Sequence, residues 1–262
     1  MKASSIVLGL MVFGGIVYLL FPVIVVVTIS FSSATYLNFP PPGYSLQWYL
    51  KMLNDPEWLS AFWVTVKVGV LASLLATLVG VPAAFALVRN AIPGQSLLNA
   101  IILSALVTPP IVSAIGVFIM YVPLGLVNSL LGLAGAHAVA GIPFVVINTA
   151  ASLRSADRDL ERAAIIHGAS PLAAAVRITV PIIAPGIVVG FILSFVHSAH
   201  ELLIASFVLG GVGKPISVKM WSQVQSTTDP SVTAASSVLI GIAILTVISV
   251  GASRSLAKRR TR

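Results

Sequence analysis

The chain has 262 residues, of which 58% are hydrophobic and only 8% are charged. Soluble domains carry about 25% charged residues, so this composition excludes an ordinary soluble domain and indicates a membrane protein. The absence of cysteine excludes disulfides, thiolate metal sites and a cysteine nucleophile.

Apolar segments of 18 or more residues recur along the chain, and each is long enough to cross a hydrocarbon core of about 30 Å as a helix. They predict an all-α polytopic membrane protein, one domain over residues 1–262, with six transmembrane helices at about 6–31, 62–88, 97–121, 131–153, 185–209 and 232–253. The first segment exceeds the apolar core of a signal peptide, about 7–15 residues, so it is predicted to be an anchor. Cleavage after Ser33 or Ala34 is the alternative.

Lysine and arginine are distributed unequally between the two sides of these segments. Eleven of the fifteen lie on one side, and three (Lys51, Lys214 and Lys219) lie on the other, with Lys67 inside the second segment. Because positive residues collect in cytoplasmic loops, both termini are predicted to be cytoplasmic. This topology accounts for most of the net charge of +8, so nucleic-acid binding is not expected.

Two segments are predicted to lie outside. Residues 32–60 begin with a stiff Pro-rich stretch, and a short amphipathic helix follows at 46–53, whose Trp48 and Tyr49 suit a membrane interface. Residues 210–230 are rich in Gly and Pro. Either segment is a packed cap or a platform for an extracytoplasmic partner, and composition leaves both open.

A polar segment at residues 154–181 interrupts the apolar pattern on the cytoplasmic side. Its acidic start, its Ser-Pro restart and its glycine predict two short helices, 160–167 and 172–180, that meet at Gly168. Pro181 is expected to end the second helix before the fifth span. Alanines are frequent in this segment, and their small side chains would let another protein approach closely and dock. A solvated connecting loop is the alternative.

Glu201 is the only acid within a predicted span. A charge at that depth costs about 2.5–3.5 kcal/mol, so it is expected to face the bundle interior or a cavity. Helical spacing places Ser194 and His197 on the same face, with His200 beside it. A structural pairing of Glu201 with a histidine or with Lys67 is the alternative. The two histidines and Glu201 diverge in angle, and no metal site is expected there.

The polar segment resembles the EAA loop of ABC-importer permeases. Its matching positions are Arg162, Ala163, Ala164, Gly168, Ile178 and Pro181. Arg162 stands where that motif has glutamate, and a glutamate lies one position earlier, at Glu161. The stretches FPPPGYSLQWY, LVTPPIV and LSFVHSAHELLIASFVLGG are similar to permeases of spermidine/putrescine-type importers, and the similarity extends over the whole chain.

The resemblance implies a permease in a bacterial inner (plasma) membrane. Its implied partners are two ATP-binding subunits that hold ATP and Mg, a second homologous permease and an extracytoplasmic solute-binding protein. No cofactor is implied on this chain, which also lacks a GxxxxGK[ST] loop and is therefore not expected to be an enzyme.

The resemblance also assigns roles within the chain. The residues expected to couple to the ATPases are Glu161, Arg162, Ala163, Ala164, Gly168, Ile178 and Pro181. The residues expected along the substrate path are Glu201, His197, His200 and Ser194. The implied solute bears an amine, as a polyamine or a related compound, with a monoamine, an amino acid-like compound or an aminophosphonate also open. A stand-alone channel or secondary carrier is the alternative function, and an intramembrane enzyme is the third.

Overall fold

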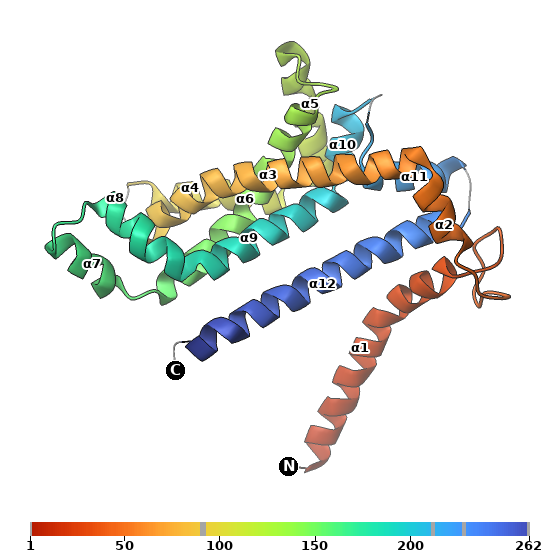
Figure 1. The fold of residues 1–262 in the computed structure, drawn as a ribbon, viewed down its shortest axis with the longest axis horizontal. Helices are drawn as coiled ribbons and strands as arrows, with labels where there is room; N and C mark the ends of the chain where they lie inside the picture. The colour runs from red at the N-terminus through yellow and green to blue at the C-terminus, as the bar shows by residue number, and fades with distance from the viewer. Residues whose placement is uncertain (1, 90–92, 211–212, 227–228, 261–262) are drawn as a thin grey trace. The chain divides into compact units, whose positions relative to one another are not determined.

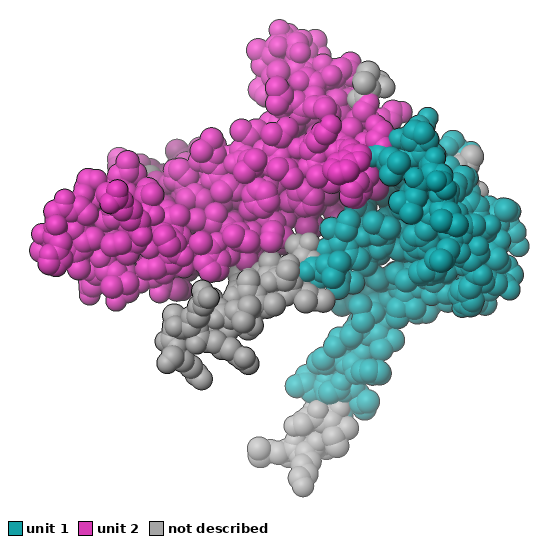
Figure 2. Space-filling view, in the orientation of Figure 1, with its two compact units in different colours: residues 1–59, 219–245 teal, residues 60–218, 246–262 magenta. Residues whose placement is uncertain are grey.

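The computed structural model describes all of the chain apart from residues 1, 90–92, 211–212, 227–228 and 261–262, with side chains described between residues 7 and 245. The described backbone is helical between its loops (Figure 1), and its one β-bridge joins Ser32 to Tyr44. The all-α class predicted from the apolar segments is therefore confirmed. The chain forms two compact units, unit 1 with residues 1–59 and 219–245, and unit 2 with residues 60–218 and 246–262 (Figure 2).

Unit 1 is organised around the segment that follows α1 (Lys2–Ser30). The predicted short helix is present as α2 (Gln47–Asn54). Trp48 is buried, and its indole Nε1 donates a hydrogen bond of 2.8 Å to the carbonyl oxygen of Ser32. The Tyr49 hydroxyl lies 2.7 Å from the hydroxyl of Ser30. The sequence had suggested that Trp48 faces a membrane interface. Instead, its side chain is buried and fastens α2 to the end of α1.

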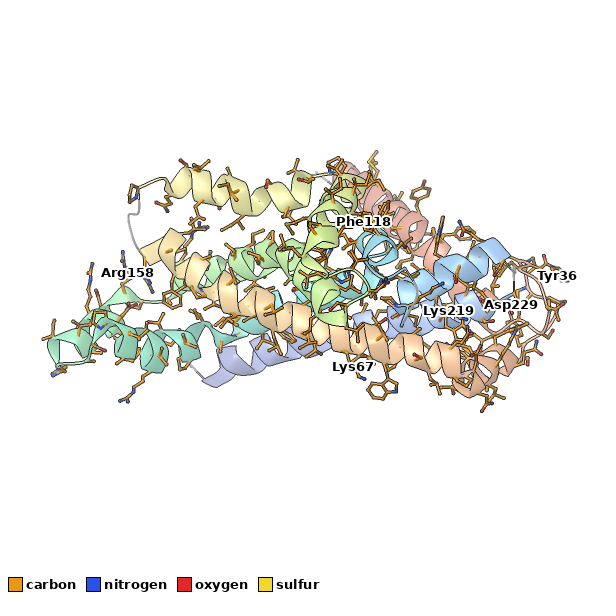
Figure 3. The ribbon with its side chains drawn as sticks, turned by 90° about the horizontal axis from the view of Figure 1, so that it is seen from above. Tyr36, Lys67, Phe118, Arg158, Lys219 and Asp229 are labelled. Atoms are coloured by element: carbon orange, nitrogen blue, oxygen red, sulfur yellow. The ribbon has the colours of Figure 1, made fainter. Side chains whose placement is uncertain are left out.

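Two ion pairs join distant parts of unit 1. Lys51 Nζ lies 2.6 Å from Asp229 Oδ2, and Lys219 pairs with Glu57; Figure 3 labels Lys219 and Asp229. Each lysine also lies over an indole ring, Lys51 over Trp48 at 5.2 Å and Lys219 over Trp58 at 5.8 Å. Within unit 1 the two segments that were predicted to lie outside are thus held together by charge and aromatic contacts.

Unit 2 contains the helices that position the polar residues. They are most of α3 (Pro56–Arg89), α4 (Gln95–Val107), α5 (Pro110–Leu124), α6 (Leu130–Ser155), α7 (Arg158–Ile166), α8 (Pro171–Ala174), the π-helix η1 (Ala175–Thr179), α9 (Val180–His200) and α10 (Leu203–Val208). The helices α11 (Ile216–Ser226) and α12 (Ser231–Arg260) continue the chain. In unit 2, α6 packs along α9 (Figure 1), where Gly190 brings the two backbones together: a Cβ there would lie 2.7 Å from Val145 Cα.

Four helical segments are each long and apolar enough to cross a membrane: Val7–Ser30, Pro56–Arg89, Leu130–Ser155 and Pro171–His200. The helices α4 and α5 meet this criterion only as a pair bent by 106°. The described apolar part of α12, Ser231–Leu245, is shorter. By length and composition, the described residues therefore contain four candidate spans, or five if the bent pair is one span.

Two predicted spans were wrong in detail. The third span, predicted at 97–121, is broken between α4 and α5 because Pro109 and Pro110 remove backbone donors and disfavour helix at the residue before each of them. The fifth span, predicted at 185–209, begins instead at Pro171 and ends at His200. Both errors arise where proline or a polar cap outweighs the apolar pattern.

Candidate functional site

The polar segment between α6 and α9 folds as its local signals predicted at its start and at its corner. The Asp157 side chain accepts a hydrogen bond from the Asp159 amide at the start of α7, and Ser170 caps α8 by accepting from the Ala173 amide. Gly168 has φ +92°, a left-handed conformation that glycine adopts without steric cost. The corner between the two helices is therefore confirmed.

The end of this segment differs from the prediction. Pro181 does not break the helix, because α8 continues through η1 directly into α9. A π-turn widens the helix by one residue, and Pro181 follows it in the first turn of α9, where the missing N–H is tolerated. The predicted second short helix is thus the first part of a long one, and Ile178 lies within the π-turn.

Glu161 on α7 faces the rest of unit 2. Its Oε2 accepts a hydrogen bond of 3.0 Å from Thr179 Oγ1 and lies 3.7 Å from Arg89 Nε at the end of α3. The Arg89 side chain is only 8% exposed, and its Nη2 donates to the carbonyl oxygen of Ala156 at 3.3 Å. Arg158 (Figure 3) donates in turn to the carbonyl oxygen of Arg89 at 2.9 Å. We call Glu161, Arg89 and Thr179, the last residue of η1 directly before α9, the α3–α7–α9 link.

The opposite face of α7 is open to solvent. Arg162 Nη1 lies 3.2 Å from Asp159 Oδ1, and both side chains are exposed. Ala163 is exposed and Ala164 is partly exposed, so the helix surface beside Arg162 is flat. Ile166, at the end of α7, is 83% exposed. This face combines an accessible arginine with small and apolar side chains, which are the features of a surface that another protein can cover.

Glu201 lies at a break in the backbone, and its predicted place inside a continuous span was wrong. The residue follows the last residue of α9 with φ −70° and ψ 112°. Its Oε1 accepts from the amides of Leu203 at 3.0 Å and Ile204 at 3.1 Å, which are the first free donors of α10. A carboxylate that caps a new helix competes with continuation of the old one, so the helix ends here.

Around Glu201 the structure brings together some of the predicted polar residues. His197 Nε2 lies 4.0 Å from Glu201 Oε2, while the His200 ring bonds its own helix through the carbonyl oxygen of Val196 at 2.8 Å. Ser194 is buried one turn earlier, directly against Gly141 of α6. His200 therefore does not join Glu201, and Ser194 contacts α6. Lys67 is exposed on α3 (Figure 3) and forms no ion pair with Glu201 in the described residues.

His137 of α6 completes the polar contacts between α6 and α9. Its Nδ1 lies 2.7 Å from the Ser198 hydroxyl, and the side chain is almost fully buried. His137 is therefore a packed, hydrogen-bonded helix residue. Across the described ranges, no three His, Asp or Glu side chains gather as a metal-ligand set.

The sequence alone did not single out Arg89 or Thr179, and it placed Ser198 only beside the polar face of the fifth predicted span. Arg89 was assigned only to the cytoplasmic side by its charge, and nothing near it in the chain indicates Glu161 as its partner. Thr179 and Ser198 are ordinary helix residues by composition. Their roles come from contacts between helices that are distant in sequence, which a single-sequence pattern does not contain.

Comparison with known proteins gives consistent matches. Residues 76–262 match the family model described as binding-protein-dependent transport system inner membrane component. The spermidine/putrescine transport system permease protein PotC of Escherichia coli strain K12 is 28% identical over 246 residues, covering 94% of this chain and 91% of that protein. The molybdenum transport system permease protein ModB of Mycobacterium bovis is 30% identical over 217 residues, covering 77% and 81%.

A solved structure has the same fold. It is that of a bacterial ABC transporter involved in the import of the acidic polysaccharide alginate, with a TM-score of 0.72 and 19% sequence identity. The match covers 97% of this chain and 96% of that one. At this identity the likeness concerns the fold alone.

Proposed function

The chain belongs to the family of binding-protein-dependent transport system inner membrane components, so it is a permease subunit of an ABC importer and not an enzyme; we propose that it moves a small amine-bearing solute, a polyamine or a related compound, into the cytoplasm. The single observation that carries the amine is the carboxylate of Glu201, held at the break between α9 and α10. The similarity to PotC over most of the chain supports it. The family assignment removes the stand-alone channel and the secondary carrier.

The geometry of Glu201 suits a cation. Two amide donors hold Oε1 in place, while Oε2 has His197 at 4.0 Å as its neighbour. The side chain is 11% exposed, so an ammonium group that reached it would meet a largely desolvated carboxylate. Charge pairs in such surroundings are stronger than at a surface. We assign Glu201 to the substrate path, with His197 beside it and with Ser194 and His200 in supporting positions.

The same proposal includes the assembly. The chain would span the inner membrane six times with both termini in the cytoplasm, with the bent pair α4 and α5 as one span and α12 as the last. It would pair with a second homologous permease, receive solute from an extracytoplasmic binding protein and contact two ATP-binding subunits that hold ATP and Mg. The excess of lysine and arginine on one side supports the orientation.

We propose that the open face of α7 is the surface that the ATP-binding subunits contact, through Arg162, Ala163 and Ala164. Gly168 sets the corner of this segment, and Ile178 and Pro181 continue it into α9. Glu161 acts within the chain, because its carboxylate is already engaged by Arg89 and Thr179. A movement imposed on α7 would then reach α3 and α9 through the α3–α7–α9 link.

The substrate proposal is tested by uptake of labelled putrescine and spermidine into cells that carry the complete transporter with Glu201→Gln. Glutamine keeps an oxygen for the amides of Leu203 and Ile204, so folding and membrane level are expected to stay normal. Loss of a buried charge pair predicts that the efficiency of uptake falls about tenfold or more. Glu201→Asp, which keeps the charge, is the matched control and should retain more uptake.

Wild-type uptake by Glu201→Gln at equal membrane level would remove Glu201 from the substrate path. A competition experiment tests the solute class separately. Unlabelled molybdate, the kind of solute named for the relative ModB, is added during uptake of the labelled amines and should leave that uptake unchanged. If molybdate is taken up and amines are not, the amine proposal is wrong while the permease role stands. Purification of the tagged chain tests the assembly, since ATPases and a second permease should accompany it.

A further inference from the structure

A cavity of about 470 Å³ lies in unit 2 between α3, α4 and α6. Its wall has two chemically different parts. The polar part consists of Gln95, Ser96 and Asn99 on α4 with Arg154 in the last turn of α6, and the apolar part includes Val146 and Ala150 on α6. The cavity therefore combines a guanidinium group and polar side chains with an apolar stretch of α6, and the Gln95 Nε2 already donates to the carbonyl oxygen of Leu87.

Arg154 supplies the charge of this cavity. In the described part of the chain it takes part in no ion pair, whereas Arg89 and Arg162 each have an acidic partner. Its side chain is accessible, so the guanidinium group can meet a ligand from outside. An uncompensated arginine repels an amine, which separates this cavity from the proposed substrate path at Glu201. It favours an anion.

The apolar wall decides which anion fits. A small inorganic oxyanion would use only Arg154 and the amide groups and would leave the surfaces of Val146 and Ala150 unsatisfied. A phospholipid matches both parts, with its phosphate against the guanidinium and the start of an acyl chain against α6. Basic pockets between helices on the cytoplasmic side are where anionic lipid headgroups bind. We propose that this cavity binds the headgroup of an anionic phospholipid of the phosphatidylglycerol type.

The cavity lies at the ends of α3 and α6 that carry Arg89 and Arg154, the ends assigned to the cytoplasmic side. The lipid would come from that leaflet and would hold α4 against α6 at its polar end. The proposal goes beyond solute transport and does not depend on which solute is carried. Its test therefore measures lipid binding and not uptake.

The experiment uses the intact transporter complex, purified in detergent, depleted of lipid and titrated with phosphatidylglycerol or phosphatidylcholine. Native mass spectrometry counts the retained lipids. Both lipids offer a phosphate to the guanidinium, but phosphatidylcholine also carries a choline cation that neutralises its headgroup and that the unpaired Arg154 repels. The wild-type complex is therefore expected to retain phosphatidylglycerol about tenfold more strongly than phosphatidylcholine. Arg154→Gln should abolish this preference. Arg177→Gln, which removes an exposed arginine outside the cavity lining, should keep it.

Thermal unfolding of the same complexes shows whether the variants are folded. Without lipid, wild type and Arg154→Gln should unfold at the same temperature, and phosphatidylglycerol should raise that temperature only for wild type and Arg177→Gln. Equal phosphatidylglycerol binding by wild type and Arg154→Gln would overturn the proposal. Displacement of the lipid by free inorganic phosphate at equal concentration would also overturn it, in favour of a small-anion site.

Discussion

The α3–α7–α9 link can be tested by removing one charge from it. In Glu161→Gln the side chain keeps its shape and an oxygen for the Thr179 hydroxyl, but Arg89 loses its only acidic partner among the described residues. The transporter is expected to hydrolyse ATP while solute uptake falls, because α7 would move without drawing α3 and α9 with it. Measuring both activities on the same preparation separates this uncoupling from loss of protein.

The size of the effect follows from distance and burial. At 3.7 Å the attraction between Arg89 and Glu161 is about 4.5 kcal/mol at an effective dielectric constant of about 20. Removing one partner of a buried ion pair lowers the free energy of unfolding by about 3–5 kcal/mol. The lower value applies here because the Glu161 side chain is 21% exposed. A loss of about 3 kcal/mol would accelerate hydrogen exchange of the α7 amides by about two orders of magnitude.

The matched control lies on the same helix. Arg162 and Asp159 form a pair at 3.2 Å with both side chains exposed, so Arg162→Gln should change the stability of α7 by less than about 1 kcal/mol. A double-mutant cycle adds specificity: Arg89→Met should cost less stability in the Glu161→Met background than in the wild type, because it then removes a buried charge that has already lost its partner. If Glu161→Gln and Arg162→Gln give indistinguishable exchange in α7, the assignment of Glu161 as an internal link is refuted.

Two further predictions concern packing and pH. Gly190→Ala should lower the stability of the purified complex by about 1–3 kcal/mol in thermal unfolding, because its Cβ would lie 2.7 Å from Val145 Cα. The control Gly116→Ala places its Cβ in open space and should be neutral. Equal effects of the two substitutions would contradict the close approach of α6 and α9. Burial alone would raise the pKa of Asp229, but hydrogen bonds from Lys51 and Ser231 lower it. The Lys51–Asp229 ion pair should therefore stabilise unit 1 above about pH 4 and lose this effect as the pH falls through the lowered pKa of Asp229. Lys51→Met should accordingly make the unfolding temperature less sensitive to acid. An unchanged pH profile of the unfolding temperature would show that the pair contributes nothing to stability.

The sequence by itself determined the features that depend on composition and on near neighbours. The low charge content and the long apolar segments specify helices in a membrane, since a helix satisfies its backbone groups within a single apolar segment. The acid at Asp157, the serine at Ser170 and the glycine at Gly168 fixed the caps and the corner of the polar segment. Each acts within about one turn of helix, so the sequence predicts it directly.

Only the tertiary structure decided which polar groups meet. Glu161 and Arg162 are adjacent charged residues on one short helix. Glu161 faces Arg89 and Thr179, whereas Arg162 faces solvent. Helical periodicity gives the angle between neighbouring side chains but not which face the rest of the chain covers. The π-turn before Pro181 and the break at Glu201 were missed for a related reason: each exchanges regular helix bonds for other contacts, and the apolar pattern does not contain that competition.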